Sequence, residues 1–122
     1  MDAAGVLLAT QVDEPSADFV LCVQIDGKDP PSQIVAGLQR ANKIVVPGSE
    51  CQWVPTTSGS YYLRTHHRAY IINVHNAKWL TGMSFQVQVD KLHTAKWGAG
   101  FIAKMAQNGD KWIVIELTSW IV

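Results

Sequence analysis

Two groups of side chains in the second half of the chain could take part in proton transfer. His75 and Asp90 lie on neighbouring stretches in which polar and apolar residues alternate. If these stretches pair as antiparallel strands, Asn73 faces Asp90 and Gln88 faces His75, which makes the histidine and the aspartate diagonal neighbours. Such a pair can orient an imidazole as a general base. The pairing brings no serine or cysteine nucleophile beside them, so a solvated polar sheet face is the favoured interpretation.

Glu116 is the other candidate for a catalytic base. The same pairing scheme predicts that it lies on the apolar face of the sheet, beside Phe101 and Val89. An apolar pocket makes a carboxylate a better proton acceptor, which is the usual route to a carboxylate base. The favoured alternative is a strand-end glutamate that reaches solvent or pairs with Lys91 or Lys104.

Aromatic residues gather on that same predicted face, which suggests a cavity that holds a small, partly apolar ligand. Small-molecule sites usually combine apolar walls with a few polar groups that orient the ligand. The predicted ligand-binding residues are Tyr70, His93, Trp97, Phe101, Glu116 and Trp120.

The sequence predicts neither a metal nor a cofactor. Adjacent histidines such as His66 and His67 point to opposite faces of an extended chain and form a poor metal pair, and no phosphate loop, dinucleotide glycine pattern or zinc spacing occurs. Cys22 and Cys51 have no metal-binding spacing either. Cys22 lies in an apolar run, where a buried free thiol is expected. A disulfide between the two cysteines requires export of the chain.

Composition indicates one globular domain over residues 1–122, with 48% hydrophobic and 16% charged residues. Ten basic residues balance ten acidic ones, which argues against nucleic acid or a membrane surface as a partner. No apolar run is long enough to cross a membrane, and no signal peptide is recognisable. The expected location is cytoplasmic if Met1 is the native start, and periplasmic or secreted otherwise.

The elements that would position these groups form a C-terminal meander of four antiparallel strands. Turn signals at Thr81-Gly82, Thr94–Lys96 and Asn108-Gly109 separate the strand-like runs. The predicted strands are residues 70–79, 84–93, 98–107 and 111–120.

The first half of the chain supplies one principal helix and several short strands. A helix is predicted from Asp29-Pro30 to about Asn42, because aspartate can cap it and proline fits its first turn. A continuously apolar strand is predicted over residues 18–25, and shorter strands over 43–46, 51–54 and 61–63. The fold class is therefore α+β, with a mostly antiparallel, strongly bent sheet.

A helix packed on a bent antiparallel meander resembles the cystatin-like or NTF2-like α+β group. This resemblance implies a cone-shaped cavity between helix and sheet. The passages from Ile25 to Pro31 and from Val46 to Cys51, with the ending from Trp112 to Trp120, also resemble small uncharacterised bacterial proteins, some of them carried on mobile gene cassettes. That second resemblance implies no particular activity and no catalytic residues.

Three functions remain open on the sequence alone. The leading one is a non-enzymatic bacterial module that binds a small ligand or a partner in an aromatic-lined cavity. The second is a small hydrolase or isomerase-type enzyme that uses Glu116, or with less support His75 and Asp90, as its base. The third is a structural homodimer, because the chain ends in the apolar strand Trp120-Ile-Val122, whose edge needs cover.

Overall fold

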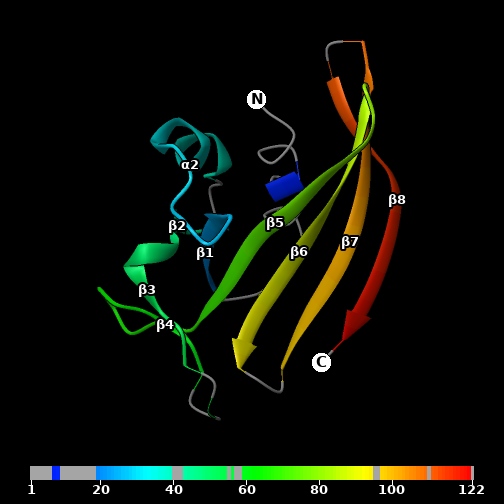
Figure 1. The fold of residues 1–122 in the computed structure, drawn as a ribbon. Helices are drawn as coiled ribbons and strands as arrows, with labels where there is room; N and C mark the ends of the chain where they lie inside the picture. The colour runs from blue at the N-terminus through cyan, green and yellow to red at the C-terminus, as the bar shows by residue number, and fades with distance from the viewer. Residues whose placement is uncertain are drawn as a thin grey trace.

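The computed structural model describes residues 7–8, 19–39, 43–54, 56, 59–94, 97–109 and 111–121. Within these residues, the chain forms a six-stranded main sheet in the order β2-β1-β5-β6-β7-β8 and a two-stranded small sheet, β3-β4 (Figure 1). The elements are β1 (Val20–Ile25), α2 (Ser32–Leu38), β2 (Val45–Pro47), the 3-10 turn η1 (Gly48–Glu50), β3 (Cys51–Gln52), β4 (Tyr61–Tyr62), β5 (Ala69–Thr81), β6 (Ser84–Thr94), β7 (Trp97–Asn108) and β8 (Lys111–Ile121). The predicted α+β class is confirmed.

Strands β5 to β8 are the predicted meander, and each extends the predicted run by one to three residues. They appear in Figure 1 as long, curved arrows lying side by side. The last hairpin turns at Gly109, whose φ of 68° is readily adopted only by a residue without Cβ. The alternation of apolar and polar residues and the turn chemistry thus agree locally, which is why this half of the fold could be predicted.

The predicted register holds for the first three strands of the meander, except next to their turns. Ile72 pairs with Lys91, and Val89 pairs with Phe101, as the alternation indicates. The first turn is one residue later than predicted, with Thr81 opposite Ser84, and two irregularities in the pairing then restore the predicted register. One sheet surface, the inner face, therefore carries Ile72, Val89 and Phe101.

The predicted register of β8 is wrong. The hairpin closes with Asn108 opposite Lys111. The first residues of β8 therefore pair with other partners than predicted, but their side chains stay on the predicted face. A bulge between Lys104 and Met105 then adds one residue to β8, and one extra residue turns all following side chains to the other face. Glu116 consequently pairs with Lys104 and not with Phe101.

Strand β1 lies inside the main sheet and is parallel to both of its neighbours. Val20 pairs with Ala69 of β5, and Leu21 pairs with Val45 of β2. The sheet is therefore mixed, which limits the prediction of a mostly antiparallel sheet to β5–β8. The continuously apolar sequence of β1 fits this central place, because both faces of the strand are covered. Val20 to Val23 are all buried.

The helix is shorter than predicted and begins later. It covers Ser32–Leu38, with Pro31 at its N-cap and no side-chain cap. Asp29 does not cap it, because the Asp29 carboxylate accepts hydrogen bonds from the Ser49 amide, at 2.9 Å, and from the Ser49 hydroxyl. The predicted end near Asn42 lies outside the described residues.

The inner face packs against the helix and the N-terminal segment. Ile34, Val35 and Leu38 of α2 contact this core, and so do Leu7 and Leu8. Figure 1 shows α2 and the short blue piece at residues 7–8 on the same side of the main sheet. A second, smaller core lies on the opposite, outer face; its buried members are Val20, Cys22, Val46, Tyr62 and Ala69.

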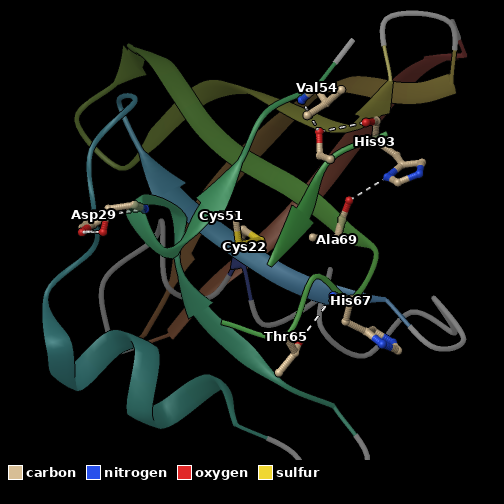
Figure 2. The surroundings of a disulfide bond; sticks show 10 residues. Cys22, Asp29, Cys51, Val54, Thr65, His67, Ala69 and His93 are labelled. Carbon is tan, nitrogen blue, oxygen red and sulfur yellow. Dashed lines mark hydrogen bonds between the residues drawn. A yellow bond between two sulfur atoms is a disulfide. The ribbon is translucent and has the colours of Figure 1, made fainter. Parts of the chain in front are cut away.

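A disulfide links the two sheets. Cys22 of β1 is bonded to Cys51 of β3, with their Cα atoms 6.4 Å apart (Figure 2). The expectation of a buried free thiol at Cys22 is therefore wrong. Strands of two residues form a small sheet with little stability of its own, so this bond and the smaller core hold β3 and β4 on the outer face. No helix among the described residues is long and apolar enough to cross a membrane.

Candidate functional site

A pocket of about 260 Å³ opens on the outer face, where the small sheet meets the main sheet. We call it the Trp53 pocket. Its lining residues come from β1, β5, β6 and the segment after β3: Gln24, Trp53, Ile71, Asn73, Asp90 and Leu92. Pockets for drug-sized ligands measure about 300–1,000 Å³, so this one suits a ligand of roughly one ring.

Three polar residues cross the floor of the Trp53 pocket as one row of the sheet. Gln24 pairs with Asn73, and Asn73 pairs with Asp90. Neighbouring strands lie about 4.8 Å apart, so the three polar groups are evenly spaced across β1, β5 and β6. The row continues to Gly100 of β7, which brings no side chain to the side of Asp90 that faces β7.

The next row along the sheet brings His75 against Asp90. Nε2 of His75 lies 2.7 Å from Oδ2 of Asp90, and Nε2 of Gln88 lies 3.5 Å from Oδ1. Because a carboxylate accepts hydrogen bonds, Nε2 of the imidazole donates here, and in the neutral ring Nδ1 then carries the lone pair. The predicted diagonal contact between His75 and Asp90 is confirmed. Both side chains are part-buried.

The amide of Asn73 has a defined orientation. Its Oδ1 accepts a hydrogen bond of 3.0 Å from the backbone N–H of Gly27, in the tight turn that follows β1. Its Nδ2 has no hydrogen-bond partner among the described residues and can therefore donate to a ligand. The pocket floor thus places an N–H donor on β5 directly beside the carboxylate acceptor of Asp90 on β6.

Trp53 forms the wall of the pocket and is held from both sides. On one side, Cys51 carries the disulfide and pairs with Tyr62. On the other side, the N–H of Val54 donates a 3.0 Å hydrogen bond to the hydroxyl of Ser60, which itself donates to the carbonyl of His93 at 2.9 Å (Figure 2). Trp53 remains 39% exposed, so its indole presents apolar surface to solvent.

The predicted ligand-binding residues of the inner face pack closely against other side chains. Phe101 is buried in the larger core. His93 is only 5% exposed, and its Nδ1 donates to the carbonyl of Ala69 at 2.9 Å (Figure 2). Its ring packs edge-on against Phe19. The ring of Tyr70 lies 4.4 Å from that of Phe19. These three side chains thus pack against protein groups, and a binding role for the predicted residues stays a prediction.

Burial raises the pKa of the Tyr70 phenol above its ordinary value, and the positive charge of Arg68 partly offsets this rise. The phenol therefore stays protonated at neutral pH. Tyr70 acts in the structure as an apolar surface, with the Lys91 ammonium 5.0 Å from the centre of its ring.

Glu116 lies on the outer face, contrary to the prediction. Its Oε2 is 3.1 Å from Nζ of Lys104, and its side chain is 57% exposed. The bulge in the β7–β8 pairing is the physical reason, since it reverses the face on which Glu116 lies. The glutamate is therefore separated from Phe101 and His93 by the sheet, and the expected alternative, an ion pair with Lys104, is confirmed.

The side chains of Trp97 and Trp120 lie outside the described part of the structure. Their backbones pair with Thr94 and Gly100 respectively. The basic stretch from Arg64 to Arg68 is an exposed turn in which His66 stacks on Tyr61. A shallower hollow of about 430 Å³ beside this turn is lined by Ser49, Glu50, Tyr62, Leu63 and Arg64. Within the described residues no group of side chains could hold a metal ion.

Sequence reasoning found Asn73, Asp90 and His75 but missed Gln24 and Trp53. Gln24 joins the polar row only because β1 pairs with β5 in parallel, and no local signal marks such a pairing. Trp53 reaches the outer face through the disulfide at Cys51. The one available signal was the presence of two cysteines with a tryptophan two positions after the second.

No protein-family model matches the chain, and no curated protein or solved structure does so either. The resemblance to the cystatin-like or NTF2-like group therefore stays a prediction. What the protein can bind or catalyse has to be inferred from its own residues.

Proposed function

We propose that the protein is a ligand-binding module and that the Trp53 pocket is its site. The supporting observation is the combination of a partly exposed indole with a row of three polar groups in one pocket. Small-molecule sites combine apolar walls with a few oriented polar groups, and the Trp53 pocket has both. The proposal keeps the binding function expected from the sequence but moves it from the inner face to the outer face.

Ligand-observed NMR with a defined set of single-ring probes tests this proposal. The set contains indole, benzoate, cyclohexylammonium, benzamide and methyl α-D-glucopyranoside. We expect saturation transfer to at least one probe, and we expect Trp53→Ala to remove it. Trp79→Ala is the matched control, because Trp79 is 64% exposed at the far end of β5. Probe signals that are equal in the wild type and in Trp53→Ala would contradict the proposal.

Hydrolysis or isomerisation is a second candidate function, favoured by the 2.7 Å contact between His75 and Asp90. In that arrangement Asp90 fixes the tautomer of the imidazole, and Nδ1 of His75 is available to take a proton from a substrate or a water molecule. Turnover of p-nitrophenyl acetate tests it. His75→Asn should abolish turnover above the rate of free imidazole, whereas His66→Asn, in the exposed turn, should not. Equal rates in the two variants would exclude His75 as the base.

The disulfide supports the expectation of an exported rather than a cytoplasmic protein. Structural disulfides persist in oxidising compartments and are rare in the cytosol. The Cys22–Cys51 bond anchors the strand that carries the chain into Trp53, so we infer that the pocket forms fully only where this bond can form.

A further inference from the structure

We propose that the ligand of the Trp53 pocket is one ring of a saccharide, free or at the end of a glycan. This inference rests on the proposed binding function and names the chemical class of the ligand. It is carried by the arrangement of donors and acceptors on the pocket floor and by the indole that faces them.

The floor of the Trp53 pocket is complementary to a ligand group that both donates and accepts hydrogen bonds. Oδ1 of Asn73 accepts from the N–H of Gly27, whereas its Nδ2 has no hydrogen-bond partner among the described residues and can donate to a ligand. Asp90 lies directly opposite on the next strand and can only accept. A hydroxyl satisfies both neighbours at once, by accepting from the amide of Asn73 and donating to the carboxylate of Asp90. An ammonium group only donates, and a carboxylate or phosphate only accepts.

Charge and hydrogen bonding together favour a neutral ligand. An anion would meet the carboxylate of Asp90 at close range. An ammonium group could use the remaining lone pairs of Asp90, but it offers no acceptor to the N–H of Asn73. A neutral hydroxyl can use the remaining lone pairs of Asp90 without displacing His75, because a carboxylate offers about four acceptor positions.

The spacing and shape of the pocket suit a ring with several hydroxyls. Gln24, Asn73 and Asp90 repeat at the strand spacing of about 4.8 Å, which is comparable to the separation of hydroxyls on opposite sides of a six-membered ring. Ile71 and Leu92 form an apolar strip in the neighbouring row. The indole of Trp53 can then cover the C–H face of the ring, whose hydroxyls point outward along its edge. The volume of about 260 Å³ limits the ligand in the pocket to about one such ring.

Titration calorimetry and saturation-transfer NMR with methyl glycosides test the inference. The probes are the methyl glycosides of glucose, galactose, mannose and N-acetylglucosamine, each compared with a trisaccharide that ends in the same sugar. Cyclohexylammonium and benzoate are the cationic and anionic controls. We expect at least one glycoside to bind and neither control to bind. Stronger binding of the trisaccharide would indicate a glycan end as the ligand, and equal binding would indicate a free sugar.

Variants separate the polar floor from general stability. Asp90→Asn should weaken glycoside binding at least about tenfold, since a hydrogen bond to a charged acceptor is lost. Trp53→Phe should retain part of the affinity, and Trp53→Ala should lose it. Glu116→Gln removes another carboxylate on the same face and should leave binding unchanged. Thermal unfolding of each variant shows whether the fold is intact, and unchanged affinity in a folded Asp90→Asn variant would overturn the inference.

The two proposals fail in different ways. If benzoate, indole or cyclohexylammonium binds at Trp53 and no glycoside does, the binding function stands and the saccharide inference is wrong. If no probe of either set responds to Trp53→Ala, both are wrong.

Discussion

At the scale of single residues, Gly59 shows how closely the support of the pocket is packed. Its φ is 76°, and a Cβ added there would lie 2.1 Å from Nε2 of His93. The ring of His93 cannot move aside, because it is hydrogen-bonded to Ala69 and packed against Phe19. Position 59 therefore needs glycine for two independent reasons.

Replacing Gly59 should destabilise the fold strongly. A left-handed conformation costs a residue with Cβ about 1–2 kcal/mol, and the clash with His93 adds to that cost. We expect Gly59→Ala to lower the free energy of unfolding by more than about 2 kcal/mol. Gly109→Ala is the control, because its φ is also positive but nothing lies within 4 Å of the added Cβ. Equal losses in urea unfolding would show that the contact with His93 does not matter.

Ser60 links the pocket wall to the main sheet. The fully buried hydroxyl accepts from the N–H of Val54 and donates to the carbonyl of His93. Ser60→Ala should cost about 1–3 kcal/mol, because it leaves the N–H of Val54 without its partner. It should also weaken ligand binding, since Val54 follows Trp53. Chemical denaturation measures the first effect and calorimetry the second. A stability loss with unchanged affinity would mean that Ser60 does not position Trp53.

Glu116 should prove unimportant for both stability and binding. Its ion pair with Lys104 is largely exposed, and such pairs contribute about 0–1 kcal/mol. We expect Glu116→Gln to change the unfolding free energy by less than about 0.5 kcal/mol. A large loss of activity or binding in this variant would restore Glu116 as a site residue.

At the scale of elements, the β3–β4 hairpin depends on the disulfide. Two strands of two residues each are marginal alone, and the Cys22–Cys51 bond fixes them to β1. Disulfides that close loops of this length typically contribute about 2–4 kcal/mol. We therefore expect dithiothreitol to lower the unfolding midpoint of the wild type and to weaken ligand binding. The Cys22→Ala, Cys51→Ala double variant is the control, and dithiothreitol should leave it unchanged. A wild type indifferent to the reductant would show that the bond does not form.

The elements that the sequence predicted correctly are those made by neighbouring parts of the chain. Strands β5 to β8 are joined by short turns, so alternation and turn residues determine them locally. The bulge at Lys104 has no comparable sequence signal. Because one extra residue reverses the face of the residues that follow, Glu116 was predicted on the inner face but lies on the outer one. The candidate site was predicted only in part for the same reason. Asp90 and His75 belong to one hairpin, whereas Gln24 and Trp53 arrive through long-range pairing.

At the scale of the whole molecule, the edge of the main sheet favours self-association. Strand β8 lies at one end of the sheet, and Ile113, Val114 and Ile115 are exposed along it. Exposed apolar edge strands are templates for pairing with another chain. We therefore predict a homodimer, measurable as twice the chain mass in light scattering. Ile115→Lys should shift the protein toward the monomer, whereas Leu63→Lys, at an exposed apolar residue of the turn after β4, should not. A wild-type monomer at high concentration would contradict this prediction.

The central place of β1 also governs when the fold can be completed during synthesis. β1 leaves the ribosome early, but its long partner β5 begins only at Ala69, and parallel pairing needs both strands at once. Until then the apolar run from Val20 to Val23 has only the three-residue β2 to pair with. The β5–β8 hairpins can form by local closure, so β1 is expected to dock onto a pre-existing meander in the slow step. Nascent or truncated chains that end before Ala69 would therefore expose this run to aggregation, and their yield should depend on chaperones.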